Sequence, residues 1–255
     1  MSSAIVTQRS NKALRNDRAE QFESCAMAHK QTVLIIGASR GLGLALAEEY
    51  CRRDWQVIAT VRRTSEQLNA LAARFPGNLA METVDINDAE QVRALRGRLN
   101  DRRLEVLFVN AGICVARDNT PADVDVADFT ELMITNALSP MRVVELFESL
   151  VASRGAVAVM SSGLGSITQN RGFWEIYSAS KAALNMLMKC FAGRHPGDPR
   201  ALLLIAPGWV RTDMGGAGAS LSIEESIPGV VDAVESNLGR AGLRFIDNRG
   251  ATVPW

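Results

Sequence analysis

Short apolar runs alternate with amphipathic segments from residue 32 to the end of this 255-residue chain. The apolar runs have the length of β-strands and lie at residues 33–36, 57–61, 79–84, 106–109, 156–160, 202–205 and, more weakly, 243–246. The segments between them have helical periodicity, near residues 41–53, 65–74, 88–100, 128–152, 177–193 and 223–238. Because near-continuous apolar strands are typical of parallel sheets that are buried on both faces, the alternation predicts an α/β fold. We expect one domain, a doubly wound sheet of about seven mostly parallel strands with helices on both faces.

The first thirty residues do not share this pattern. They are polar and mixed in charge, and they lack the apolar stretch of a secretory signal. The acidic residues Asp17, Glu20 and Glu23 argue against a mitochondrial transit peptide. We therefore expect residues 1–30 to form a disordered tail, with a weak helix as the alternative, and residues 31–255 to form the domain. Met27 is an alternative start of the chain.

Composition and charge exclude several classes of function. The 28 basic and 28 acidic side chains balance, so charge gives no reason to expect a nucleic acid or an anionic membrane as partner. No apolar run reaches the roughly 18 residues that a membrane span needs. The four cysteines are scattered without metal-ligand spacing, and the two histidines are isolated. We expect reduced thiols in a cytoplasmic protein, no metal site and no Ser-His-Asp triad.

Tyr177 and Lys181 are the first residues that suggest chemistry. They stand four residues apart in a predicted helix and therefore share one of its faces. A lysine charge roughly 5 Å from a phenol, at an effective dielectric constant of about 20, favours the phenolate by about 3 kcal/mol. That energy lowers the tyrosine pKa by about two units from its usual value near 10, toward the range of efficient acid–base catalysis. By itself the pair is also compatible with two solvated surface residues.

A glycine turn follows the first predicted strand. Gly37, Gly41 and Gly43 are spaced GxxxGxG, and a predicted helix begins at once. Such glycines let the backbone approach a pyrophosphate, and the N-terminus of the helix offers free N–H groups to it. The turn therefore predicts a dinucleotide site.

Five motifs in this order resemble the short-chain dehydrogenase/reductase family. Besides the glycine turn and the Tyr-x-x-x-Lys pair, they are Asn-Ala-Gly at 110–112, Ser-Ser at 161–162 and Pro-Gly at 207–208. The segments 161–167 and 207–216 and the C-terminal Val-Pro-Trp resemble the C-factor/Sniffer-like carbonyl reductase branch. The resemblance covers nearly all of residues 32–255 and implies a Rossmann-type fold. Ile36 departs from it, because the family usually has threonine there, and we expect looser packing against the turn at Asn110.

The resemblance implies a role for four residues. Tyr177 would donate the proton to a carbonyl, and Lys181 would lower the pKa of Tyr177 and bind the nicotinamide ribose. Ser162 would hold the substrate oxygen, whereas Ser161 is expected to point away from the site. Asn136 would support a water relay behind Lys181. The alternatives are that Ser162 is an ordinary turn residue and that Asn136 hydrogen-bonds a helix backbone.

The expected cofactor is NADP(H). A carboxylate at the end of the second strand would bind a free ribose hydroxyl, but Arg62 and Arg63 stand there, and Arg40 adds a cation within the glycine turn. Guanidinium groups suit a 2′-phosphate, although these arginines are also compatible with solvated surface positions. The expected cofactor-binding residues are Gly37, Ser39, Arg40, Gly41, Leu42, Gly43, Arg62, Asp85, Ile86, Asn110, Ala111, Gly112, Tyr177, Lys181, Pro207, Gly208, Val210 and Thr212.

The substrate pocket is expected to be apolar. The side chains that we place around it are Ile113, Cys114, Leu164, Trp174, Trp209 and Met214. Phe173 and Trp174, in the loop 169–175, are equally compatible with simple packing. The glycine-rich segment 215–220 is either a lid over the site or a surface connection.

These expectations combine into one function and two alternatives. The main hypothesis is an NADP(H)-dependent oxidoreductase that acts on the carbonyl or alcohol of a small, largely apolar substrate, with Tyr177 as general acid/base. The alternative is a cofactor-binding signalling or regulatory protein of the C-factor type. A nucleotide-sugar epimerase fits less well, because its glycine spacing differs. The family also implies a homodimer or homotetramer formed through the helices near 128–152 and 177–193.

Overall fold

The structure is a computed structural model that describes residues 30–255. The expectations for a tail at residues 1–30 and for a start at Met27 fall outside the described residues, apart from Lys30. Residues Gln31–Trp255 form one compact unit. No helix in this part of the chain is both long enough and apolar enough to cross a bilayer.

A parallel sheet of seven strands forms the centre of this unit, in the order β3–β2–β1–β4–β5–β6–β7. The strands are β1 (Thr32–Ile36), β2 (Gln56–Val61), β3 (Leu79–Thr83), β4 (Leu104–Val109), β5 (Val151–Met160), β6 (Ala201–Ala206) and β7 (Gly242–Asp247). The strand order reverses between β1 and β4, which creates the crevice where doubly wound sheets bind their ligands. The predicted Rossmann-type sheet of seven strands is confirmed.

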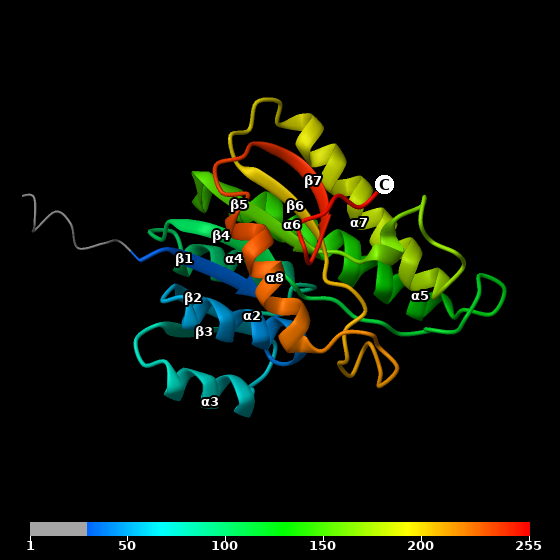
Figure 1. Cartoon of the computed structure of the whole chain (residues 1–255), viewed down its shortest axis with the longest axis horizontal. Coiled ribbons are helices and arrows are strands. Elements are labelled where there is room, and N and C mark those ends of the chain that lie inside the picture. The colour runs from blue at the N-terminus through cyan, green and yellow to red at the C-terminus, as the bar shows by residue number, and fades with distance from the viewer. Residues whose placement is uncertain (1–29) are drawn as a thin grey trace, which may run out of the picture. The chain divides into compact units, whose positions relative to one another are not determined.

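Helices cover both faces of the sheet (Figure 1). They are α2 (Gly41–Arg52), α3 (Glu66–Arg74), α4 (Ala89–Arg98), α5 (Val126–Met133), α6 (Ser139–Phe147), α7 (Glu175–Arg194) and α8 (Ile223–Glu235). The alternation of side chains along β1 divides the core into two layers. Leu34 and Ile36 face α4, α6 and α7, whereas Val33 and Ile35 face α2, α3 and α8. Burial on both faces explains why the strand reads as a continuous apolar run.

Side-chain caps fix where several helices begin. The Ser65 hydroxyl accepts a hydrogen bond from the N–H of Leu68, and Asp88 caps α4 in the same way. Ser222 and Glu225 form a reciprocal capping box at the start of α8. These caps satisfy backbone donors that the helices themselves leave without partners.

The prediction of one continuous helix at 128–152 is wrong, because the chain changes conformation within this stretch and the helical part ends before residue 152. The chain forms α5, a π-helical turn at Ile134–Leu138, α6 and a short 3-10 turn at Glu148–Leu150. Strand β5 already begins at Val151, which pairs with Leu104. The apolar pattern does not separate the two elements because residues buried in a strand and in a helix end look alike over so short a stretch.

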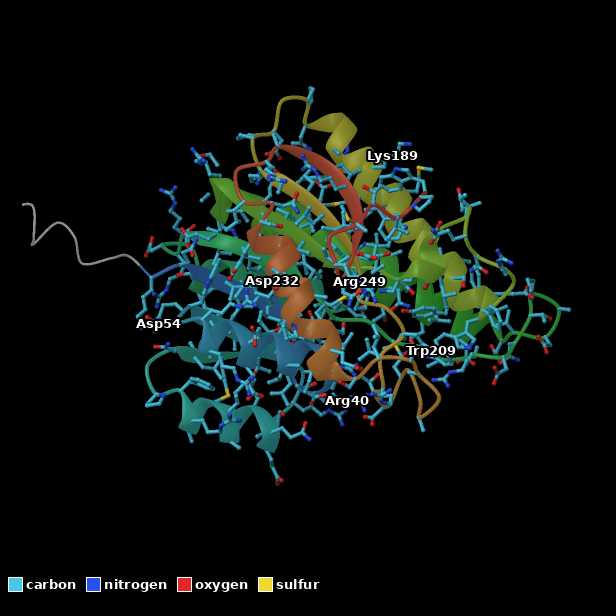
Figure 2. The ribbon with its side chains drawn as sticks, viewed as in Figure 1. Arg40, Asp54, Lys189, Trp209, Asp232 and Arg249 are labelled. Atoms are coloured by element: carbon cyan, nitrogen blue, oxygen red, sulfur yellow. The ribbon has the colours of Figure 1, made fainter. Side chains whose placement is uncertain are left out.

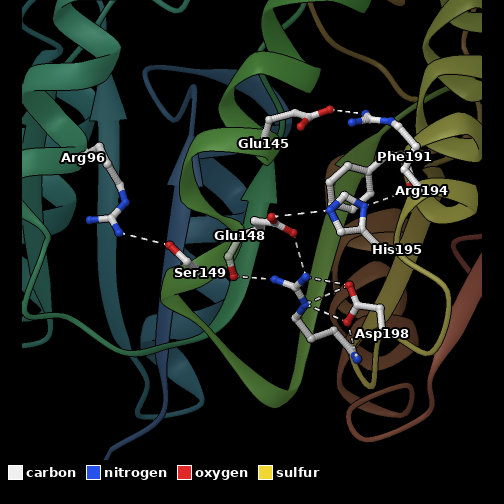
Figure 3. Close-up of polar contacts among 9 residues, drawn as sticks. Arg96, Glu145, Glu148, Ser149, Phe191, Arg194, His195 and Asp198 are labelled. Atoms are coloured by element: carbon white, nitrogen blue, oxygen red, sulfur yellow. Dashed lines mark hydrogen bonds and ion pairs between the residues drawn. The ribbon is translucent and has the colours of Figure 1, made fainter.

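Ion pairs join the segments that precede β5 and β6, at the end of the sheet opposite to the carboxyl ends of the strands (Figure 3). Arg200 contacts both Glu148 and Asp198, at 2.8 Å and 2.6 Å. His195 Nδ1 lies 2.8 Å from the carbonyl of Phe191, and its Nε2 faces Glu148. This network fixes the amino ends of the two strands, which leaves the opposite end for the site.

Candidate active site

The loops at the carboxyl ends of the strands enclose a cavity of about 1160 Å³. Residues that follow β1, β2, β3, β4, β5 and β6 all line it, together with one face of α7. Figure 2 shows Arg40 and Trp209, two of its lining residues, on the side of the sheet where the loop after β6 runs. The cavity thus lies where the reversal of strand order predicts a ligand site.

Most of the residues expected at a dinucleotide site line this cavity. They are Gly37, Ser39, Arg40, Gly41, Leu42, Arg62, Asp85, Ile86, Asn110, Ala111, Gly112, Tyr177, Lys181, Pro207, Gly208, Val210 and Thr212. Gly43 is the exception. A Cβ on Gly43 would stand 2.0 Å from the carbonyl oxygen of Gly37, so this glycine packs beneath the turn instead of facing the cavity.

The glycine turn is held by contacts that require glycine. Gly37 and Gly41 have φ values of 89° and 55°, a region that other residues rarely adopt. A Cβ on Gly37 would also stand 2.9 Å from the Cα of Ala111. The Gly37 N–H donates to the hydroxyl of Thr60 at 3.0 Å, which ties the turn to β2. Thr60 belongs to none of the sequence motifs, so the sequence did not indicate this contact.

Asn110 locks the turn after β4 to the glycine turn. Its Nδ2 donates to the carbonyl of Gly37 at 2.7 Å. The backbone N–H groups of Asn110 and Ala111 both donate to the carbonyl of Ile36, at 3.0 Å and 2.9 Å. The looser packing expected from Ile36 is therefore wrong, because these contacts use its backbone while its side chain is buried in the core.

Two of the expected phosphate-binding arginines lie at the mouth of the cavity. Arg62 directly follows β2 and is exposed. Arg40 forms an ion pair with Asp213 at 2.7 Å, and both side chains are largely exposed. The pairing of Arg40 with a residue of the loop after β6 was not predicted, because the two positions are 173 residues apart.

Tyr177 and Lys181 lie on the buried face of α7. Their exposed fractions are 7% and 3%. Lys181 Nζ donates to the carbonyl of Met160 at 2.9 Å and lies 5.8 Å from the centre of the Tyr177 ring. The i, i+4 spacing thus brings the two groups together at the cavity, as the sequence predicts.

Burial changes the proton affinities of this pair. It raises the pKa of Tyr177 above 10, with a further increase from nearby Cys114 and an opposing decrease from a hydrogen bond with Ser162. Burial lowers the pKa of Lys181 to about 8, an effect that Cys114 partly opposes. The predicted lowering of the Tyr177 pKa is wrong for this structure, because the sequence argument counted the lysine charge and omitted desolvation.

The two serines after β5 point to different places. Ser162 lines the cavity near Tyr177, whose pKa its hydroxyl lowers, and accepts a hydrogen bond from the N–H of Leu164 at 3.2 Å. Ser161 is buried and donates to Oδ1 of Asn185 at 2.7 Å. Of the two hydroxyls, the one of Ser162 therefore stands beside the phenol.

Asn136 lies behind the cavity wall. It is fully buried in the π-helical turn, and its Oδ1 accepts from the N–H of Ile113 at 2.8 Å. Its Nδ2 donates to the carbonyl of Ile113 and to the hydroxyl of Ser180, at 2.9 Å and 3.0 Å. A Cβ on Gly112 would stand 3.2 Å from Asn136 Oδ1 and 3.5 Å from Lys181 Nζ. Asn136 positions the loop after β4 next to Lys181 and does not reach the cavity itself.

The expected apolar pocket is present, and it contains a cation that sequence reasoning missed. Ile113, Cys114, Leu164, Phe173, Trp174, Trp209 and Met214 all line the cavity. Trp174 has a left-handed backbone conformation and contacts Tyr177 edge-on, with 5.9 Å between ring centres. The guanidinium carbon of Arg117 lies 4.5 Å from the centre of the Trp174 ring. Arg117 belongs to no motif, so no sequence signal pointed to it.

The glycine-rich segment 215–220 is tied down at several points. Trp209 Nε1 donates to the carbonyl of Gly215 at 2.9 Å, and the Gly215 N–H donates to the hydroxyl of Thr212 at 3.0 Å. Val210 and Leu221 form a parallel bridge across the base of the segment. These contacts hold both ends of the segment, and of its residues Gly215 lines the cavity.

Comparisons with known proteins agree with this geometry. The short chain dehydrogenase family model matches residues 31–220. A short-chain dehydrogenase/reductase structure from Burkholderia multivorans with bound NADP is 53% identical, covers 89% of this chain and 100% of its own, and superposes with a TM-score of 0.87. The carbonyl reductase Sniffer of D. melanogaster is 28% identical over 89% of this chain and 100% of its own, with a TM-score of 0.78. The C-signal of Myxococcus xanthus is 34% identical over 60% of this chain and 93% of its own.

Proposed function

Because this chain belongs to the short chain dehydrogenase family of oxidoreductases and is similar to C-signal and to Sniffer-like carbonyl reductases, we propose that it reduces aldehydes or ketones with NADPH. The reverse reaction is the oxidation of the matching alcohol with NADP⁺. The substrate is a small and largely apolar carbonyl compound, in keeping with the apolar side chains around Tyr177.

One observation carries the proposal. The side chains of Tyr177 and Ser162 line one cavity with Lys181, whose Nζ lies 5.8 Å from the centre of the Tyr177 ring, and this cavity continues to the glycine turn. The proton donor Tyr177, the hydroxyl of Ser162 that would bind the substrate oxygen, and the glycine turn that would bind the dinucleotide thus line the same cavity. A purely regulatory cofactor-binding protein has no need of the first two.

The residues present fit NADP(H). The close approach of Gly37 to Ala111 leaves bare backbone at the start of α2, which suits a pyrophosphate. Arg62, and Arg40 after release from Asp213, supply guanidinium groups for a 2′-phosphate. Asp85, Ile86 and Lys181 line the same cavity, where Asp85 and Ile86 would contact the adenine and Lys181 would contact the nicotinamide ribose. The cofactor, when bound, supplies the hydride.

The protein's own residues supply the proton and the orientation. Ser162 holds the carbonyl oxygen of the substrate by a hydrogen bond, within reach of the Tyr177 hydroxyl. Tyr177 donates its proton to that oxygen as negative charge develops there. The charge of Lys181 then stabilises the phenolate, and burial of both groups strengthens this interaction. Asn136 keeps the loop at Ile113 in place beside Lys181.

The direct test measures oxidation of NADPH and NADH against a broad panel of aldehydes and ketones. We expect turnover with NADPH and a preference for it over NADH. The Tyr177→Phe variant, which retains the ring, should bind NADPH and lose turnover. Absence of turnover with every carbonyl compound, combined with tight NADPH binding, would favour the regulatory alternative.

Two further properties belong to the proposal. Among residues 30–255 the cysteines are Cys51, Cys114 and Cys190, and each is a free thiol, which supports a reducing, cytoplasmic location.

Met186 and Leu187 expose apolar side chains on the outer face of α7, 57% and 39% accessible. These support a homodimer or homotetramer through α7 and the α5–α6 segment, which light scattering at micromolar concentration would test.

A further inference from the structure

Arg117 is a cation within an otherwise apolar substrate pocket. Its guanidinium group stacks on Trp174, and Trp174 in turn contacts the ring of Tyr177. The two successive separations are 4.5 Å and 5.9 Å, so the cation lies within the length of a small substrate from the proton donor. The apolar residues around them are Ile113, Val115, Leu164 and Met214.

No carboxylate of residues 30–255 neutralises Arg117. Within this part of the chain its guanidinium group donates a hydrogen bond to the carbonyl of Met214, and its charge lowers the pKa of the nearby Cys114 thiol. Arg40, which also lines the cavity, pairs with Asp213. Asp118 follows Arg117 in the chain, but it is exposed and forms no ion pair with it. A guanidinium group has five N–H donors, so Arg117 retains donors for a ligand.

From this placement we propose that Arg117 recognises a carboxylate on the substrate, so that the preferred substrates are carbonyl compounds with a carboxylate separated from the carbonyl by an apolar spacer. The proposal rests on the proposed reductase function. The carbonyl group would lie at Ser162 and Tyr177, the spacer against Trp174 and Leu164, and the carboxylate at Arg117. Arginine suits this task because its planar fork binds both carboxylate oxygens.

A matched pair of substrates separates charge recognition from shape. 4-Carboxybenzaldehyde and its methyl ester share the aldehyde and the ring and differ in charge. We expect the wild-type enzyme to prefer the acid over the ester by about tenfold or more in kcat/KM, since a charge-assisted hydrogen bond contributes that much. A wild-type enzyme that prefers the ester would overturn the proposal.

Variants at Arg117 separate recognition from a merely structural role. In Arg117→Met we expect the acid-to-ester ratio to fall to about one, and in Arg117→Lys to take an intermediate value, because the charge remains without the fork. Arg171→Met is the matched control, because Arg171 is exposed on the neighbouring loop and does not line the cavity. It changes the net charge equally and should retain the wild-type ratio. Equal losses for acid and ester in Arg117→Met would show that Arg117 only ties loops together, which would overturn the proposal.

A binding measurement keeps the proposal testable apart from turnover. Calorimetry with NADP⁺ present would compare 4-(hydroxymethyl)benzoate with its methyl ester. Tighter binding of the acid, lost in Arg117→Met, supports carboxylate recognition even if no NADPH is oxidised, and that result would count against the proposed reductase alone. Equal binding of acid and ester overturns the carboxylate proposal, whatever the enzyme's activity on neutral aldehydes.

Discussion

The ammonium group of Lys181 lies 5.8 Å from the centre of the Tyr177 ring, and both side chains are almost completely buried. Burial favours the neutral form of each, so the pKa of Tyr177 rises and that of Lys181 falls to about 8. At neutral pH the phenol therefore keeps its proton while most Lys181 side chains are still charged. This is the protonation state that the reduction of a carbonyl requires.

Loss of the Tyr177 hydroxyl should remove the proton donor and little else. In Tyr177→Phe we expect kcat to fall by about 10²- to 10⁴-fold, the usual range for a general acid, with the dissociation constant of NADPH within twofold of wild type. Stopped-flow assays and fluorescence titration measure the two. Tyr50→Phe is the matched control, because the Tyr50 hydroxyl is buried in the core and has no hydrogen-bond partner among residues 30–255. Its activity should remain at the wild-type level, and unimpaired turnover in Tyr177→Phe would contradict the mechanism.

The lowered pKa of Lys181 should appear in the pH dependence of stability. The unfolded chain keeps this proton up to about pH 10.5, whereas the folded protein releases it above about pH 8. The unfolded state therefore binds more protons in this window, and the free energy of unfolding rises with pH. From pH 7.5 to 9.5 we expect the wild type to gain about 2 kcal/mol relative to Lys181→Met in urea unfolding.

The comparison with Lys181→Met is needed because other groups titrate in the same range. The pKa of Cys51 is raised to about 11 by burial, and its contribution to stability has the opposite sign between pH 9 and 11. Cys51 is present in both proteins, so its effect cancels in the difference. A difference that stays constant from pH 7.5 to 9.5 would mean that Lys181 has an ordinary pKa in the folded state.

The fold was largely predictable because the inner strands β1, β4 and β6 are buried on both faces. The run at residues 33–36, which lies in β1, has no polar position, and such runs are typical of a parallel sheet covered on both faces. The break between α5 and α6 was not predictable in this way. The π-helical turn that carries Asn136 depends on hydrogen bonds to Ile113 and Ser180, which are distant in sequence.

The site was predictable where a motif fixes both residue type and spacing. Gly37 and Tyr177 are examples, since a turn and a helix bring their motif partners close by local geometry. Arg117, Asp213 and Thr60 were missed because their contacts join segments that are distant in the sequence, and pairwise proximity of that kind leaves no pattern in one sequence. The pKa of Tyr177 depends on burial, which spacing also does not reveal.

Removal of either arginine at the mouth of the cavity should weaken discrimination between the two cofactors. In Arg62→Ala and in Arg40→Ala we expect the preference for NADPH over NADH to fall by about tenfold or more, because each loses a charge-assisted contact to the 2′-phosphate. The affinity for NADH should change little, since NADH lacks that phosphate. Comparison of kcat/KM for the two cofactors measures the effect, and an unchanged ratio in both variants would rule out these arginines as the phosphate site.

Asp213 should oppose NADPH binding because its ion pair with Arg40 competes with the contact between Arg40 and the 2′-phosphate. The pair is exposed, so its rupture costs little, and its absence should improve affinity by about two- to fivefold. We therefore expect Asp213→Asn to lower the KM for NADPH and to leave the KM for NADH unchanged. The gain should disappear in the Arg40→Ala background, because there is then no pair to break. A gain of the same size in that background would assign the effect to the general field of Asp213.

Two glycines in helices should respond in opposite ways to alanine. A Cβ on Gly43 would stand 2.0 Å from the carbonyl of Gly37 and 2.5 Å from Asn110 Nδ2, so α2 must move away from the glycine turn. We expect Gly43→Ala to lower the free energy of unfolding by about 3 kcal/mol, near the upper end for overpacking, and to weaken NADPH binding. Gly97 is exposed in α4, and a Cβ there meets no atom of the described part of the chain within 4 Å. Gly97→Ala should therefore stabilise the protein by up to about 1 kcal/mol, since alanine favours helix. Urea unfolding with and without NADPH measures both variants, and normal NADPH binding in Gly43→Ala would show that the turn tolerates displacement of α2.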